Sequence, residues 1–240
     1  MIETLFARKV VEERSSDCTT NGILPSVRRP RRARIVLIVV LLGVASIAIY
    51  AFRRPILRAA GWTLIVNDSI EPADVIVVTV EADGAGVLEA ADLVHSGVAA
   101  RVAVFGEPPD TVEREFILRG IQYDDAAARS VRQLRLLGLD TIGLVPTYVA
   151  GSEDEGPALA DWCDQHKFRS VVVVSTSDHS RRLRRLLHRS MKGHFTRIMI
   201  RYSRYSVFDP DRWWQSHVGI RTEVAELEKL LRDIVRHPIS

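Results

Sequence analysis

The chain has 240 residues, 47% of them apolar and 26% charged, and a formal net charge of +3. This is enough apolar sequence for one α/β domain with a real core and accessory segments. Its two cysteines, Cys18 and Cys163, have no CxxC or metal-type neighbours, so neither a disulfide, a redox motif nor a zinc site is predicted. The basic residues cluster without a recognisable recognition module, so nucleic acid is not predicted as a partner.

Residues 1–34 are predicted to be a disordered tail that ends in a basic block, Arg28, Arg29, Arg31, Arg32 and Arg34. Residues 35–52 carry no charge, and at about 1.5 Å per residue they extend roughly 27 Å, enough for a single transmembrane helix. A buried core helix and a cleaved signal peptide are the alternatives. The flanking arginines argue against the first, and Ile49 is a poor residue for a cleavage site that ends at Ala51.

The flanking charges also predict an orientation. Five arginines precede the apolar segment, whereas Arg53, Arg54 and Arg58 follow it. Because positively charged flanks stay in the cytoplasm, we expect a single-pass protein of the cytoplasmic (inner) membrane. Its N-terminus would lie in the cytoplasm and its C-terminal domain outside, in the periplasm. Cys18 and Cys163 would then lie on opposite sides of the membrane and could not pair.

After the span, residues 53–72 are predicted to be a juxtamembrane helix or linker, and residues 73–240 an α/β domain. Strands are predicted at 75–80, 101–105, 141–149, 170–175 and 197–202. Helices are predicted at 87–95, 111–119, 126–137, 153–166 and 181–191. This alternation predicts a mainly parallel sheet with helices on both faces, a Rossmann-like three-layer α/β/α sandwich.

The C-terminal segment is predicted to be an amphipathic helix, with one apolar stripe formed by Ile220, Val224, Leu227, Leu231 and Ile234. Glu228 and Arg232 are spaced to form an ion pair on it. The expected role of the stripe is to dock on the sheet, and binding of a partner is the alternative. Trp213 and Trp214, just before the helix, are expected to pack in the core or to line the rim of an apolar site.

Candidate chemistry begins at Ser152-x-x-Glu155, where the third strand turns into a helix. The spacing is that of a capping box, in which hydroxyl and carboxylate satisfy backbone N–H groups at the helix start. The alternative is that Glu155 points into the crevice beyond the strand ends, where ligands bind in open α/β sheets. The sequence leaves both interpretations open.

The fourth strand is followed by Thr176, Ser177, Asp178 and His179 at the start of another helix. Ser177 or Asp178 could cap this helix and leave N–H groups that favour an anion. Arg182 lies three residues after His179, so the two side chains share a face and could converge on a phosphate. The alternative is a surface histidine beside a solvated basic face, to which three further arginines are assigned, Arg184, Arg185 and Arg189.

Glu81 and Asp83 follow the first strand, at the carboxyl edge of the sheet, and could bind a polar ligand or simply be solvated. Gly84 and Gly86 permit a tight turn there, but the GxGxxG fingerprint of dinucleotide sites is missing. The chain also has no nucleophile elbow, HExxH or Walker A motif. No metal ligands are predicted, and no cofactor is assigned.

Several of these motifs together resemble the YdcF/SanA/ElyC-like family. The resemblance covers residues 73–231 and includes ADVIVV at the first strand, a Ser-x-x-Glu corner, and a Thr-Ser-x-His-x-x-Arg element, matched by Ser152, Glu155, Thr176, Ser177, His179 and Arg182. It departs from the family at Val80-Glu81-Ala82-Asp83, where a Gly-Gly element is usual, and at Ser152, where Thr is usual. The resemblance implies a Rossmann-like domain, often anchored in the membrane, with a role in envelope integrity or cell-wall precursor metabolism. One soluble relative is associated with S-adenosylmethionine.

The first functional hypothesis is an envelope-biogenesis protein that binds an anionic, phosphorylated or lipid-linked intermediate. Arg182 would hold the anion, His179 would donate or shuttle a proton, and Glu155 would orient the ligand or act as base. The second is a nucleotide-type binder of S-adenosylmethionine or a similar ligand, with Glu81 or Asp83 on a ribose. The third is a non-enzymatic envelope scaffold. The reaction and the oligomeric state are not predicted.

Overall fold

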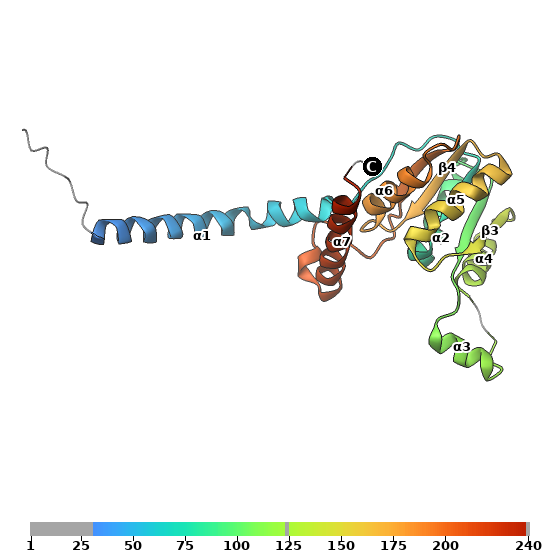
Figure 1. Ribbon diagram of the computed structural model, residues 1–240, viewed down its shortest axis with the longest axis horizontal. Helices are drawn as coiled ribbons and strands as arrows, with labels where there is room; N and C mark the ends of the chain where they lie inside the picture. The colour runs from blue at the N-terminus through green and yellow to red at the C-terminus, as the bar shows by residue number, and fades with distance from the viewer. Residues whose placement is uncertain (1–30, 123–124, 239–240) are drawn as a thin grey trace, which may run out of the picture. The chain divides into compact units, whose positions relative to one another are not determined.

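A computed structural model describes residues 31–122 and 125–238 (Figure 1). The chain divides into two compact units, Met1–Tyr50 and Ala51–Ser240. The helix α1 (Arg31–Trp62) begins in the first unit. Its apolar part is exposed, and α1 is long and apolar enough to cross a membrane. Such a helix can be a membrane anchor or a signal sequence. Cys18 and most of the predicted basic tail lie outside the described residues.

The second unit is built on a parallel sheet with the strand order 3-2-1-4-5. Its strands are β1 (Val75–Val78), β2 (Val102–Gly106), β3 (Ile142–Tyr148), β4 (Ser170–Ser175) and β5 (Arg197–Tyr202). The central strands β1 and β4 are buried runs of valine and isoleucine, as expected for strands covered on both faces. The Rossmann-like α/β prediction is therefore confirmed.

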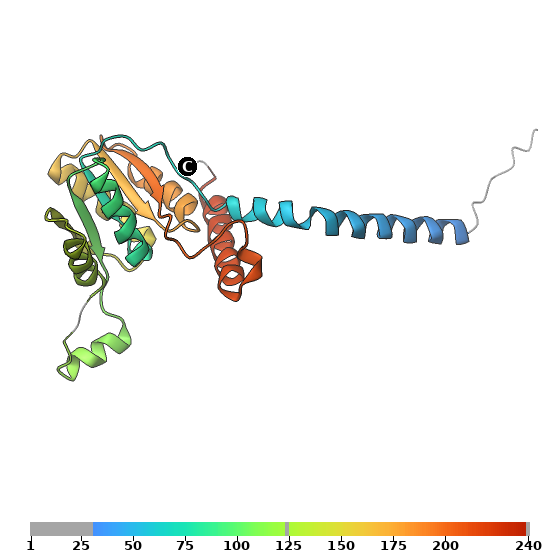
Figure 2. The ribbon, with the colours of Figure 1, turned by 180° about the vertical axis from the view of Figure 1, so that it is seen from behind.

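Helices cover both faces of the sheet (Figures 1 and 2). Their bounds are α2 (Asp83–His95), α3 (Thr111–Leu118), α4 (Ala126–Leu136), α5 (Ser152–His166), α6 (Ser180–Ser190) and α7 (His217–Arg236). Short 3-10 turns occur at η1 (Val80–Ala82) and η2 (Trp213–Gln215). Helices α2 and α4 pack on one face, and α5 and α6 on the other.

Successive side chains along each strand point to opposite faces of the sheet and pack into two separate hydrophobic cores. In β1, Ile76 and Val78 point toward α2 and α4, whereas Val75 and Val77 point toward α5 and α6. Each of these side chains is at most 3% exposed. Burying such a side chain contributes about 1.5–3 kcal/mol, so the two cores together fix the three layers. The free thiol of Cys163 lies in the second core.

The first strand is shorter than predicted. It ends at Val78 instead of Val80, because the chain turns into η1 before α2 begins at Asp83. Asp83 adopts a left-handed φ of 38°, which costs energy for a residue other than glycine. The early turn brings Glu81 back over the carboxyl end of the sheet instead of extending it away.

The C-terminal helix does not pack as predicted. The face of α7 that is buried consists of Gly219, Glu223, Glu226 and Leu230. Of the predicted apolar stripe, only Leu227 is partly buried, and the other four residues are exposed. The stripe therefore does not dock on the sheet, because α7 lies beside α6 and η2 and turns an acidic face inward. The predicted ion pair of Glu228 with Arg232 is confirmed, at 2.5 Å.

Two arginines assigned to a solvated face instead hold α6 against α7. Arg185 and Arg189 both contact the carboxylate of Asp233, each at 2.6 Å. Asp233 has only 9% of its side chain exposed, so these ion pairs are more than surface contacts. Arg184 is half-exposed and pairs with Asp68 at 3.0 Å.

Candidate functional site

The candidate site lies where the strand order reverses, between β1 and β4. Ligands of open α/β sheets bind beyond the carboxyl ends of the strands at such a switch point. Here the segment after β1 brings Glu81, the segment after β4 brings His179, and the N-terminus of α5 brings Ser152 and Glu155. Three stretches that are distant in the sequence therefore meet at one sheet edge.

The Ser152-x-x-Glu155 element does not form a capping box. Gly151 is the N-cap residue of α5, and no side chain caps this helix. Ser152 Oγ instead accepts a hydrogen bond from Arg182 Nη1 at 3.0 Å, and Glu155 Oε1 accepts one from the Val80 N–H at 2.9 Å. Both side chains thus turn to other elements, but Glu155 is 1% exposed and lies behind the cleft that Ser152 lines.

His179 is fully buried and lies behind the cleft, not on its surface. Its Nδ1 lies 3.2 Å from Glu81 Oε2 and 3.5 Å from Glu226 Oε2. Neither contact has hydrogen-bond geometry, and Nε2 has no hydrogen-bond partner among the described residues. Two carboxylates therefore lie beside this buried imidazole. The interpretation of His179 as a surface residue is wrong.

Arg182 does converge with His179, as its spacing predicts, but on carboxylates of the protein itself. Its Nε donates to Glu226 Oε2 at 3.1 Å, and its Nη2 lies 3.7 Å from Glu81 Oε1. Glu226 comes from α7 and was missed in the sequence, where it lies beside an apolar stripe. Its position on the buried face of α7 is a consequence of packing that helical spacing alone does not reveal.

The start of α6 is less open to an anion than predicted. Neither Ser177 nor Asp178 caps it, and the Arg181 N–H donates to the Leu64 carbonyl at 3.0 Å. Ser177 is buried and donates to the Phe208 carbonyl at 3.2 Å. The segment after α1 therefore covers this helix end, which leaves side chains to provide any anion site.

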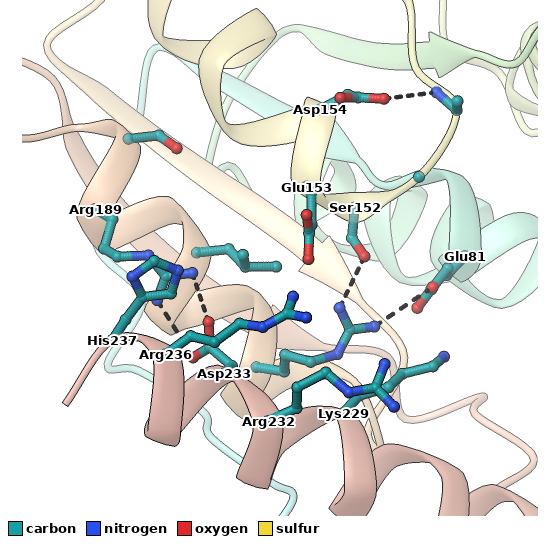
Figure 3. A pocket seen from close by; sticks show the side chains of 15 residues that line it. Glu81, Ser152, Glu153, Asp154, Arg189, Lys229, Arg232, Asp233, Arg236 and His237 are labelled. Carbon is teal, nitrogen blue, oxygen red and sulfur yellow. Dashed lines mark hydrogen bonds and ion pairs between the residues drawn. The ribbon is translucent and has the colours of Figure 1, made fainter.

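A cleft with a volume of about 630 Å³ opens in front of Ser152, Arg182 and Glu81 (Figure 3). Lys229 and Arg232 on α7 lie across the cleft from Ser152 and Glu81. The basic side chains that line it come from α6 and α7: Arg182, Arg189, Lys229, Arg232 and Arg236. Three of them belong to the C-terminal helix, for which the sequence predicted only a packing or docking role.

A second hollow of about 480 Å³ lies on the other side of Glu81. It is lined by Asp83, Thr176 and Asp178, together with the aromatic rings of Tyr205, Phe208 and Trp213. Of the predicted site residues, Ser152 and Arg182 line the first cleft, and Asp83, Thr176 and Asp178 line the second hollow. Glu81 lines both, whereas Glu155, Ser177 and His179 are buried and line neither. Trp213 is partly buried and donates to the Leu57 carbonyl at 2.8 Å, and its ring also lines the second hollow, so it both packs in the fold and forms part of the rim.

The pKa values of two buried carboxylates of the site are shifted in opposite directions. Burial raises the pKa of Glu155 to about 7, an effect that the Val80 N–H only partly offsets. Burial alone would also raise the pKa of Glu226, but His179, Lys229 and Arg182 outweigh it and lower that pKa to about 2. Paired carboxylates with separated pKa values are a feature of acid–base sites, although buried ion-pair networks also produce them.

A third buried carboxylate lies near the second hollow. Glu223 is fully buried, and neither of its oxygens has a hydrogen-bond partner among the described residues. Burial, and then the charge of Asp178, raises the pKa of Glu223 to about 7. Burial likewise raises the pKa of Asp178.

Within residues 31–122 and 125–238, no group of three or more histidine, cysteine, aspartate or glutamate side chains is placed to hold a metal ion. Comparison with protein-family models, curated proteins and solved structures finds no match for this chain. The fold and site define a Rossmann-like α/β domain preceded by one long apolar helix.

Proposed function

We propose that this chain is a membrane-anchored protein of the cell envelope that binds an anionic ligand in the cleft of Figure 3. The ligand class is a phosphorylated envelope intermediate, from the cell wall or linked to a lipid. The observation that carries the proposal is the pairing of Arg182 with Ser152 at the cleft surface, at the switch point of the sheet. The resemblance of these motifs to the YdcF/SanA/ElyC-like family supports the envelope context.

Arg182 suits this role because its position is fixed and its donors are not exhausted. Glu226 and Ser152 each accept one hydrogen bond from a guanidinium that has five N–H donors. Planar guanidinium groups bind phosphate and carboxylate through two parallel hydrogen bonds. Lys229, Arg232 and Arg236 would extend the positive field along the ligand.

Glu81 competes with an anionic ligand for the guanidinium group of Arg182. Its carboxylate lies 3.7 Å from Arg182 and its side chain is 40% exposed, so it can move into solvent. Removing its charge should therefore strengthen anion binding, whereas weakening Arg182 should reduce it. These opposite expectations separate a binding site from an ion-pair network that only stabilises the fold.

The test is calorimetric titration of the full chain in detergent micelles with inorganic pyrophosphate. Arg182→Lys keeps the charge but loses the planar fork, and we expect roughly 10- to 100-fold weaker binding, the equivalent of one charged hydrogen bond. Glu81→Gln should bind more tightly than the parent. Arg184→Gln removes an arginine from the same helix outside the cleft and serves as the matched control.

Unchanged affinity in Arg182→Lys, with circular dichroism showing an intact fold, would refute the anion site. In cells that lack this chain and depend on it for envelope integrity, expression of Arg182→Lys should fail to restore envelope integrity. His179 and Glu155 keep a proposed role in proton transfer behind Arg182. If Glu155 supplies that proton, any turnover that is found should follow its pKa of about 7.

A nucleotide-type ligand such as S-adenosylmethionine is a second candidate, and the second hollow favours it. That hollow combines Asp83 and Asp178 with aromatic rings at the same switch point. Titration with S-adenosylmethionine decides, because the absence of heat and of a thermal shift would end this candidate. The scaffold hypothesis predicts instead a partner that co-purifies with both Arg182→Lys and the parent chain.

A further inference from the structure

Helix α7 presents an apolar face that nothing in the described chain covers. Ile220, Val224 and Leu231 are 42%, 59% and 59% exposed, and Val235 is 80% exposed. These residues lie on one side of the helix, and the cleft residues Lys229 and Arg236 lie on the opposite side. The arrangement is that of an interfacial amphipathic helix, with aliphatic residues on one face and basic residues on the other.

The residues just before α7 contact the segment through which the chain would leave the membrane. Arg58 in the last turns of α1 pairs with Asp211 at 2.8 Å, and Trp213 donates to the Leu57 carbonyl. Gly61 packs so closely on Pro210 that an added Cβ would meet its carbonyl oxygen at 2.6 Å. Both views show α7 beside these last turns, residues 51–62 (Figures 1 and 2).

The exposed face is also continuous with a buried apolar cluster. Leu64, Ile65, Phe208 and Leu230 are each at most 7% exposed and pack together. Leu227, a member of the apolar stripe, is partly buried against this cluster. Leu227 therefore connects this buried cluster, which includes residues just after α1, with the outer face of α7.

We propose that this face of α7 rests on the lipid bilayer that anchors the chain. The proposal depends on the anchor of the proposed function but not on its ligand. The apolar segment ends at Phe52, and the helical residues 53–62 extend only about 14 Å, so the bilayer surface is within reach of α7. A tether of this length keeps the local concentration of bilayer high, whereas contact with a second copy depends on protein concentration.

The residues beside the face fit a headgroup layer. Arg54, Arg58, Arg212 and Trp214 line a hollow of about 670 Å³ next to η2. Tryptophan and arginine are favoured at the membrane–water interface, where a ring lies among headgroups and a cation meets lipid phosphate. Arg54 forms no ion pair with the described residues, so it remains available to anionic lipid.

The test places a fluorophore on the face in the full chain. Cys163 is buried and burial raises the pKa of its thiol to about 12, so only Cys18→Ser is needed before labelling. Val224→Cys on the apolar face and Arg236→Cys on the opposite face each receive a nitrobenzoxadiazole label. The proteins are reconstituted in vesicles of phosphatidylethanolamine and phosphatidylglycerol, with or without a nitroxide-bearing lipid.

The proposal expects blue-shifted emission at position 224, its loss with nitroxide lipid, and protection from aqueous iodide; position 236 should show the reverse. Equal iodide quenching at both positions would overturn it. Protection from iodide at 224 without quenching by nitroxide lipid would also overturn it, because protein, such as a second copy, would then cover the face. Pyrophosphate titration of the unlabelled Val224→Cys chain tests the ligand site separately, so the two proposals can fail independently.

Discussion

Replacing Glu155 by glutamine should make the domain more stable at alkaline pH. Glu155 is 1% exposed, and among the described residues only one of its carboxylate oxygens has a hydrogen-bond partner, the Val80 N–H. Glutamine has nearly the same shape and keeps a carbonyl oxygen for that N–H. The substitution therefore removes a buried ionisable group and leaves the packing of α5 largely intact.

The size of the effect follows from the pKa of about 7 in the folded protein and 4.5 as the ordinary value. A raised pKa means that the folded state holds its proton while the unfolded state loses it. Stability from this group is therefore fully present below pH 4.5 and is lost as the pH rises toward 7. At about 1.4 kcal/mol per pH unit, the parent chain loses about 3 kcal/mol that Glu155→Gln should not lose.

Guanidinium denaturation at a series of pH values measures this difference through tryptophan fluorescence. The free energy of unfolding of Glu155→Gln, relative to the parent, should increase by about 2–3 kcal/mol between pH 5 and pH 8. Glu153→Gln, which changes an exposed carboxylate two residues away in the same helix, is the control and should show no such trend. A difference that stays constant with pH would refute the assignment of a raised pKa to Glu155.

Other consequences can be checked in the same way. Gly156→Ala should cost about 1 kcal/mol in chemical denaturation, because the new Cβ would lie 2.9 Å from the Cβ of Ser190, whereas Gly84→Ala, with nothing within 4 Å, should not destabilise. Asp233→Asn should cost about 2 kcal/mol by weakening the contacts of two arginines that hold α6 to α7, and equal stability would argue against that clamp. A reporter that is active only outside the cytoplasm, fused after Ser240, should be active; activity of a cytoplasmic reporter instead would contradict the proposed orientation.

The strands could be predicted from local pattern because burial on both faces leaves a direct trace in the sequence. The predicted bounds of β4 and β5 match the structure, since continuous apolar runs such as Val171–Val174 fit few other elements. The end of β1 was predicted two residues too late. Val80 has an apolar side chain, but tertiary contact, here the hydrogen bond of its N–H to Glu155, draws it out of the strand.

Only part of the candidate site could be predicted from the sequence. His179, Arg182 and Glu155 could be identified because they follow strands, and parallel strands deliver such residues to one edge. Glu226, which pairs with Arg182, and Lys229, which donates to Glu226, could not be identified, because nothing local indicates which face of α7 is inward. Hydrophobic periodicity favoured the aliphatic stripe, whereas the inward face is the acidic one that compensates Arg182.

The sequence by itself determined the strands and helices and their alternation. Continuous apolar runs in strands, the periodicity of helices and the glycines and prolines that end them are all properties of neighbouring residues. Tertiary structure alone decided that Ser152 lines the cleft and Glu155 accepts from the Val80 N–H instead of forming a capping box, and that α7 keeps its aliphatic face outward. The physical reason is the same in both cases. A buried charge such as Arg182 must be compensated, and residues 30 and 44 positions away provide the hydroxyl and the carboxylate that do so.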